Sequence, residues 1–223
     1  MEPVEENPNV DCPHCGSRRD VHPVTVLEPN SPELEALFDG TLNQETCDAC
    51  GVSFVLQVPI VYRDDEAHVL IYYLPLEDRE QEAEAEEKME GVTEQIFGRE
   101  DTPEPPDCRL VLNRRRFVEK IALHEDGLDD RLVEYIKYQL HNRPDNKIDP
   151  VRSELFYDFT NADEQTLPFI LFDRETGEPR AGTHVPMDLY HELKRTFLTD
   201  DDMARELEQL FPGYRVTVEK ILG

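Results

Sequence analysis

Four of the five cysteines in this 223-residue chain fall into two identical Cys-x-x-Cys spacings, each followed directly by glycine. Two thiolates three positions apart can bind one ion from a tight turn, and the glycine permits the positive φ that turns backbone amides toward the sulfurs. Two such turns supply the tetrahedral set of four sulfur ligands that Zn²⁺ prefers. The spacing predicts one structural zinc ion per chain, bound by Cys12, Cys15, Cys47 and Cys50.

Other chemistries of these cysteines fit the sequence less well. A disulfide framework needs an oxidising compartment, and the N-terminus has neither the basic nor the apolar region of an export signal. Residues 12–15 are also similar to the active site of thioredoxin-fold oxidases, but no βαβ pattern precedes them and no amphipathic helix follows. Iron bound by the same four thiolates is the alternative that the ligand set leaves open.

The segment between the cysteine pairs is longer than in typical zinc ribbons, which have about 15 to 20 residues there. Here 31 residues separate Cys15 from Cys47, so we expect a folded insertion. An edge strand is predicted at 21–27, and Ser31 is the expected N-cap of a short helix that ends at Gly40.

A β-hairpin is predicted after the second cysteine pair, with strands at 53–61 and 68–74. Apolar residues lie on both faces of this hairpin, as Phe54 and Val55 illustrate. We therefore expect both faces to be covered, by the C-terminal portion, by a second copy or by another protein. A core of this size is expected to depend on the metal.

Together these features resemble the bacterial CpXC domain proteins. The resemblance rests on the two cysteine motifs, on segments 54–56, 59–62 and 71–75, and, after an acidic block, on segments 109–111, 117–121 and 127–134. It implies a cysteine metal site, and no activity is established for that family. The second motif has Asp48 where the family often has proline, which leaves the ligands unaffected.

The charge of the chain excludes several kinds of partner. It has 50 acidic and 23 basic residues, a formal net charge of −27. Direct nucleic-acid binding is not expected, because each contacted phosphate needs a Lys or Arg. Anionic membranes are disfavoured for the same reason, and no apolar run approaches the roughly 20 residues that span a bilayer. We expect a cytoplasmic protein.

The acidic residues are concentrated in one block. Residues 77–107 contain 13 acidic and 3 basic residues and end in a proline-rich turn. Such a block buries little apolar surface, so it is predicted to be an extended or frayed-helical linker. The predicted organisation is an N-terminal tail (1–10), a β-rich zinc-ribbon-like domain (11–76), the acidic linker (77–107) and an α+β C-terminal domain (108–223).

The sequence pattern of residues 108–223 predicts a small antiparallel sheet with helices on one side. After a strand at 109–112, helices are expected from the N-caps Asn113 and Asp126. Strands are predicted at 153–160, 167–172 and 183–185, helices at 186–197 and 199–210 with Thr199 as a cap, and a final strand at 214–221.

Several further residues in this half could do chemistry. Asp129, Asp130 and Glu134 could form a carboxylate cluster for Mg²⁺ or acid/base catalysis, but acids near a helix start are favoured by the helix dipole alone. The three arginines at 114–116 could contact phosphate, although pairing with neighbouring acids fits better. Cys108 stands alone, and its role is open.

The histidines of this half, at positions 124, 141, 184 and 191, share no short spacing. No phosphate loop, HExxH or GxSxG motif occurs.

The sequence thus favours a cytoplasmic, non-enzymatic protein with a structural zinc site that acts by protein–protein interaction or scaffolding, and it leaves homo-oligomers open. One alternative is an enzyme with a site in the C-terminal half, and another is an adaptor of nucleic-acid machinery. A cleft with clustered titratable groups would favour the enzyme. An exposed apolar patch without such a cleft would favour partner binding.

Overall fold

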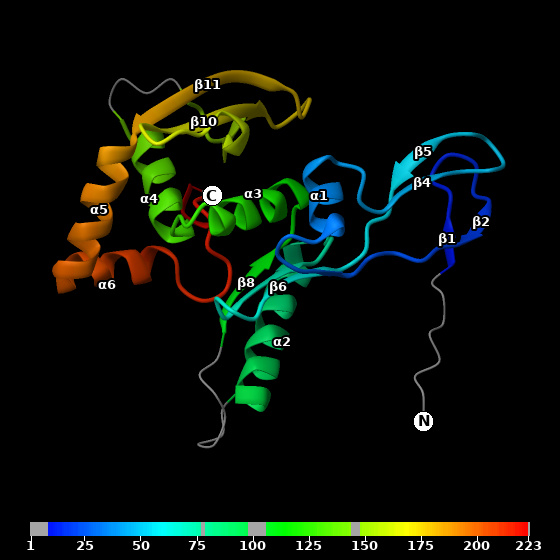
Figure 1. The fold of residues 1–223 in the computed structure, drawn as a ribbon, viewed down its shortest axis with the longest axis horizontal. Coiled ribbons are helices and arrows are strands. Elements are labelled where there is room, and N and C mark those ends of the chain that lie inside the picture. Colours follow the sequence, from blue (N-terminus) through cyan, green and yellow to red (C-terminus); the bar gives the residue numbers. More distant parts are fainter. Residues whose placement is uncertain (1–8, 77–78, 98–105, 144–147, 223) are drawn as a thin grey trace.

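The computed structural model describes residues 9–76, 79–97, 106–143 and 148–222. Within these ranges the chain forms seven α-helices, one 3-10 helix (Phe159–Asn161) and four small sheets. The predicted α+β class is therefore confirmed. Figure 1 shows two short hairpins at one side of the molecule, a central sheet with helices, and a second layer of helices and strands at the other side. Within the described ranges, every helix is too short or too polar to cross a bilayer.

Two β-hairpins contain the cysteine pairs. β1 (Asn9–Asp11) pairs with β2 (Arg18–Asp20), and β4 (Gln44–Thr46) pairs with β5 (Ser53–Val55), both in antiparallel register. The cysteine pairs occupy the turns between these strands. This arrangement is the predicted zinc-ribbon-like module.

The insertion between the hairpins folds as a strand and a helix. β3 (Val26–Leu27) is shorter than predicted, because Asn43 takes the place of a strand partner and bonds both the N–H and the C=O of Val24. α1 (Pro32–Phe38) begins after Ser31, whose side chain accepts a hydrogen bond at the helix N-terminus, as predicted.

A four-stranded sheet in the order β3-β6-β7-β8 forms the centre of the molecule. β6 (Ile60–Asp64) and β7 (Val69–Tyr73) form the predicted hairpin, although its first strand is split by a break between Val55 and Ile60. β8 (Asp107–Val111) pairs in parallel with β7. α1 and α3 (Arg114–Glu125) cover one face of the sheet (Figure 1).

The core beneath these helices combines both halves of the sequence. Its buried members are Leu27, Leu34, Leu37, Leu42, Ile60, Tyr62, Ile71, Tyr73, Val111, Phe117 and Ile121. Because β8 and α3 contribute to this core, it extends beyond the predicted zinc-ribbon-like domain of residues 11–76. The expected dependence of the core on the metal stays a prediction. Asn113 caps α3 as predicted, accepting from the backbone N–H groups of Arg115 and Arg116.

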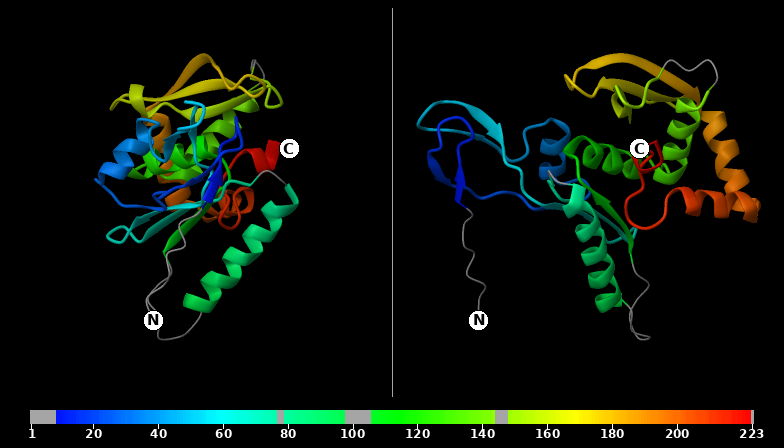
Figure 2. Two further views of the ribbon diagram at one scale, coloured as in Figure 1. Left: turned by 90° about the vertical axis from the view of Figure 1, so that its right-hand side faces the viewer. Right: turned by 180° about the vertical axis from the view of Figure 1, so that it is seen from behind.

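Much of the predicted linker is a helix. α2 (Arg79–Phe97) has 19 residues and lies on the side of the central sheet away from α1 and α3 (Figure 2). Two of its glutamates form ion pairs with the C-terminal segment: Glu82 with Arg215 at 2.9 Å, and Glu86 with Lys220 at 2.8 Å.

The second layer is the predicted antiparallel sheet with helices. Its elements are β9 (Ser153–Tyr157), β10 (Thr166–Asp173), β11 (Pro179–Pro186), α4 (Asp130–His141), α5 (Met187–Thr199) and α6 (Asp201–Leu210). Buried side chains from α3, α4, α5, α6 and the sheet form the core of this layer. They include Leu123, Val133, Phe169 and Tyr190.

Two predicted caps and one predicted strand are wrong. The N-cap of α4 is Asp129 and not the predicted Asp126. Gly127 adopts φ +68°, so the chain makes a further turn before the helix begins. The cap of α6 is Asp200, since Thr199 is the last residue of α5.

The strand predicted at 214–221 does not form in the described part of the chain, which ends in α7 (Glu219–Leu222). The side chain of Glu134 accepts from the Val218 N–H at 2.8 Å, in place of a strand partner.

Candidate metal centre

The two cysteine turns have the same backbone conformation. In the first, the Gly16 N–H donates to the Cys12 carbonyl at 2.9 Å, and in the second the Gly51 N–H donates to the Cys47 carbonyl at 2.7 Å. Gly16 and Gly51 adopt φ of +70° and +74°, the left-handed region that glycine enters without strain. The sequence-based argument for glycine after each pair is therefore confirmed.

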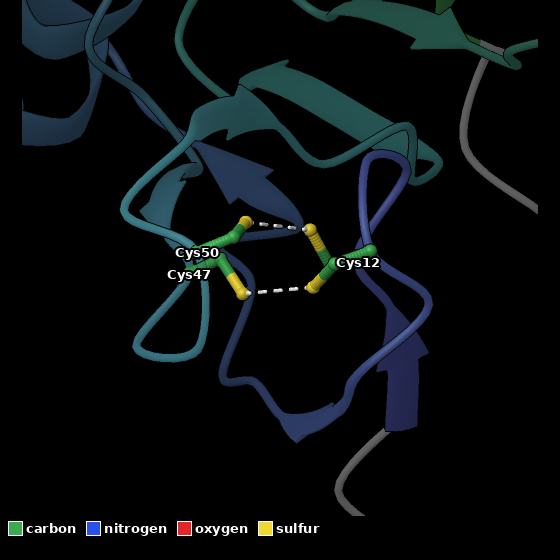
Figure 3. A group of neighbouring side chains, drawn as sticks. Cys12, Cys47 and Cys50 are labelled. Atoms are coloured by element: carbon green, nitrogen blue, oxygen red, sulfur yellow. Dashed lines mark hydrogen bonds between the residues drawn. The ribbon is translucent and has the colours of Figure 1, made fainter.

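The turns bring all four cysteine sulfurs together. They lie within 4.8 Å of one another, and all four cysteines are free thiols. Two contacts join the turns: the sulfurs of Cys12 and Cys50 are 3.8 Å apart, and those of Cys15 and Cys47 are 3.7 Å apart (Figure 3). A tetrahedral zinc with Zn–S bonds of about 2.3 Å places neighbouring sulfurs about 3.8 Å apart. The residues fit a tetrahedral metal ion.

Burial divides the four cysteines into two classes. Cys12 and Cys47 are buried, whereas Cys15 and Cys50 are exposed. The first cysteine of each turn therefore faces the interior of the module and the second faces solvent. A cluster of this kind can close around an ion that enters from the outer side.

A serine that the sequence analysis did not single out lies at this cluster. Ser17 Oγ is 3.2 Å from Cys47 Sγ and 3.4 Å from Cys15 Sγ. The hydrogen bond with this hydroxyl lowers the pKa of Cys47 to about 5 and also lowers the pKa of Cys15. Both changes favour the thiolate, which is the form that binds metals.

The pKa of Cys50 moves the opposite way. Its hydrogen bond with the Val52 backbone lowers the pKa, but desolvation and the neighbouring cysteine sulfurs together raise it to about 12. Four thiolates at this spacing repel one another, so complete deprotonation needs a cation among them. The electrostatics of the cluster therefore favour a bound cation.

Arg19 joins the two hairpins beside the cluster. Its guanidinium on β2 donates to the Thr46 carbonyl on β4 and lies 3.2 Å from the Asp48 carboxylate. This contact fixes the second turn against the first, and no spacing in the sequence indicated it.

The remaining candidate residues do not form a metal site in the ranges that the structure describes, where the cysteine cluster is the one group of possible ligands. Asp129 caps α4, as the dipole argument predicts. Asp130 and Glu134, however, form ion pairs, with Lys120 lying 2.9 Å from Asp130 and Lys137 lying 2.8 Å from Glu134. The helix-dipole interpretation is incomplete for these two acids.

These ion pairs belong to a charged network buried between α3 and α4. Lys137, which is fully buried, also lies 2.6 Å from Glu119, and Arg109 lies 2.8 Å from Asp130. Sequence periodicity did not reveal this network, since charged residues are ordinarily assigned to the surface. Its charges compensate one another in the core.

The arginines of α3 are used within the fold. Arg116 pairs with Glu154 and Glu219, so the predicted pairing with acids is confirmed for this arginine. Arg115 stacks over the Phe172 ring at 3.9 Å, and Arg114 donates to a backbone carbonyl.

Cys108 is buried, and burial raises the pKa of its thiol. His124 lies 2.8 Å from the Asp64 carboxylate, and His191 contacts the Tyr190 ring. His141 and His184 belong to no cluster of possible metal ligands in the described ranges.

A polar cleft of about 380 Å³ lies where α3, β9 and the C-terminal segment meet. It contains Glu154 and Glu219, each within 3.4 Å of both Arg116 and Arg174. Burial and a hydrogen bond with Glu219 raise the pKa of Glu154. Burial alone would raise the pKa of Glu219 as well. Its hydrogen bond with Glu154 and its ion pairs with Arg116 and Arg174 outweigh this effect and lower the pKa.

The fold and the site define an α+β protein whose two hairpins join four cysteines in a cluster able to hold a metal ion. The chain belongs to the CpXC protein family, whose sequence model matches residues 10–137. The match includes both cysteine turns, the central sheet and most of α4. Searches of curated proteins and of solved structures gave no significant match.

Proposed function

We propose that the four cysteines bind one structural zinc ion, and that the chain is a cytoplasmic, non-catalytic module that binds other proteins. The spacing of the sulfurs carries the zinc assignment, because distances of 3.7 and 3.8 Å agree with tetrahedral zinc coordination. Four protein ligands leave no coordination position for a substrate, which supports a structural role.

Zinc at this position would hold the two hairpins together. β1-β2 and β4-β5 are two-stranded sheets of three residues per strand, and such ribbons are marginal in water on their own. The ion replaces a hydrophobic core in this part of the chain. Metal binding and folding of residues 9–20 and 44–55 are therefore expected to be one event.

Metal analysis of the purified chain tests the zinc assignment. We expect about one zinc per chain in wild type and none in the variant Cys12→Ser/Cys47→Ser, with iron as the competing result for the same ligands. A variant at Cys108, which lies outside the cluster, is the matched control and should retain its zinc.

The polar cleft supports an enzyme as a second candidate. Two carboxylates whose pKa values move apart are a pattern of acid/base sites, and Glu154 and Glu219 show it. Against this, both carboxylates are already paired with Arg116 and Arg174, so the cleft offers two positive and two negative groups that satisfy one another.

Side-chain NMR tests this candidate. Small acids or amines that bind the cleft would shift the Nε–H signals of Arg116 and Arg174. Signals that stay unchanged across a mixture of such fragments support the non-enzymatic proposal.

A further inference from the structure

The central sheet has a second face that is only partly covered. Strand register places four apolar residues in a row across it: Val26 pairs with Val61, Val61 with Tyr72, and Tyr72 with Leu110. Paired residues of neighbouring strands project to the same face. This row lies on the face opposite the α1 and α3 core, to which the neighbouring Ile71 and Tyr73 belong.

Exposure increases along this row from one edge of the sheet to the other. Leu110 on β8 is 3% exposed, Val61 and Tyr72 are half-buried, and Val26 on β3 is 50% exposed. The gradient follows the position of α2, which lies opposite Tyr72 on β7 and Leu110 on β8. The β6 and β3 side of the face has no helix on it among the described elements.

Even where α2 covers the sheet, it leaves an apolar groove. A cavity of about 500 Å³ lies between the two, lined by Tyr72 and Leu110 from the sheet, by Leu74 directly after β7, and by Ala85 and Met89 from α2. Ion pairs with Arg215 and Lys220, described above, hold α2 at its other side. Tyr72 belongs both to the groove and to the row, and we call the groove together with Val61 and Val26 the open face.

The charge beside the open face defines the partner that fits it. α2 contains seven acidic and two basic residues, a net charge of −5, and the groove is bordered by Glu84 and Lys88, which pair with each other at 2.7 Å. The whole chain has a net charge of −27, so a second copy would be repelled. A basic partner would be attracted by the same field.

The geometry selects a helical partner. The open face presents side chains, and the edge strand β3 at its exposed end has only two residues, which is too short to template an added strand. A helix with an apolar stripe can lie beside α2 and complete a helical layer on the sheet.

We propose that an amphipathic helix of a partner protein, with an apolar stripe and Lys or Arg residues beside it, docks on the open face next to α2. This inference rests on the proposed protein-binding function and names its partner class. The apolar stripe contacts Tyr72, Val61 and Val26, and the basic residues lie beside the acidic helix α2.

Fluorescence anisotropy on the full zinc-loaded chain tests the proposal. The probe is a labelled leucine–lysine peptide of about 18 residues with leucines at i, i+3, i+4 and i+7. Two comparison peptides are used. One has the same composition in scrambled order, and the other has glutamate in place of each lysine. We expect the first peptide to bind at least about tenfold more tightly than either.

Matched variants locate the binding site. Ala85→Trp fills the groove, whereas Ala83→Trp makes the same change at an exposed position of α2. Val26→Lys places a charge on the open face, and Val151→Lys does so at an exposed valine elsewhere. Ala85→Trp and Val26→Lys should each weaken binding by about tenfold, and the controls by less than about twofold.

Equal binding of the scrambled peptide would overturn the proposal, because it would show that charge attraction alone causes binding. The proposal is also overturned if the variants Ala85→Trp and Val26→Lys bind the peptide as tightly as their control variants do. Zinc content is measured on the same samples. If the chain is purified without any metal, with its two hairpins folded, and still binds the peptide, the structural zinc is refuted and the open face is not. If the chain contains zinc and does not bind the peptide, the open face is refuted.

Discussion

Ser17 shows how one side chain outside the ligand set can tune the cluster. Its hydroxyl contacts two of the four sulfurs, one from each turn. Its hydrogen bond is the largest cause of the lowered pKa of Cys47, and a lowered pKa favours the thiolate form of this buried sulfur. The contact needs the close approach of the two hairpins, so the sequence position of Ser17 beside a cysteine turn did not reveal it.

The variant Ser17→Ala should weaken zinc binding, and more so in mild acid. Without the hydrogen bond, the pKa of Cys47 rises toward the ordinary thiol value of about 8.5, and protons compete with zinc below that pH. Loss of such a supporting contact typically costs about tenfold or more in metal affinity. Competition with a chromophoric chelator at pH 6 and pH 8.5 measures this, with Ser53→Ala as control. An equal loss at both pH values would contradict the argument.

Lys137 is the residue whose loss should cost most in the core. It is fully buried between Glu119 and Glu134. Lys137→Met removes the nearest positive charge from two buried carboxylates, of which Glu134 keeps only a longer pair with Lys120 at 3.6 Å, and should destabilise the fold by about 3 to 5 kcal/mol. Lys88→Met removes an exposed pair with Glu84 and should cost less than about 0.5 kcal/mol. Urea unfolding compares the two variants.

Among the elements, α3 and α4 are joined by charge as well as by apolar packing. Although burial alone would raise the pKa of Asp130, Lys120 and Arg109 lower it well below its usual range, and Lys137 and Lys120 do the same for Glu134. A lowered pKa means that the folded state holds these protons less tightly than the unfolded chain does. The network therefore stabilises the fold above the unfolded pKa values of about 4, and this stability is lost as the pH falls through the folded values.

The variant Asp130→Asn tests this pH dependence. Its deficit in unfolding free energy relative to wild type should be largest at pH 6 and should shrink below pH of about 4. Urea titrations at several pH values measure the difference. A deficit that is independent of pH would show that the Asp130 carboxylate contributes no pH-dependent stability.

The two hairpins should depend on the metal while the central sheet does not. The core under α1 contains Phe117 and Ile121 from α3, so it is closed by apolar contacts that removal of zinc leaves in place. Hydrogen exchange after chelation should show loss of protection at 9–20 and 44–55, and retained protection in β6, β7 and α3. Global loss of protection would show that the ion stabilises the whole molecule.

Sequence patterns predicted individual helices and strands better than they predicted which elements pair with one another. The Ser31 and Asn113 caps, the β6-β7 hairpin and the C-terminal sheet were all indicated by residue type and period. The pairing of β8 with β7 was not, because a parallel pairing across a long connection leaves no local signal. The final segment was predicted as a strand from its alternation, but Glu134 satisfies its backbone instead.

At the scale of the whole molecule, the family match and the cores do not share a boundary. The match ends at residue 137, whereas the core of the second layer joins residues of α3 and α4 with residues from β9 to the C-terminal segment. The second layer therefore cannot be removed without exposing apolar surface of the matched region. The four ligands were predictable because one ion fixes their types and spacing, but the buried network and the open face depend on tertiary pairing.

The most direct test of this account is the metal content of the purified full-length chain, measured by elemental analysis together with thiol titration. The account predicts about one zinc per chain, four thiols protected from reagent until a chelator is added, and Cys108 accessible only after unfolding because it is buried. A chain that folds without metal, with Cys12 and Cys15 joined in a disulfide, would contradict it.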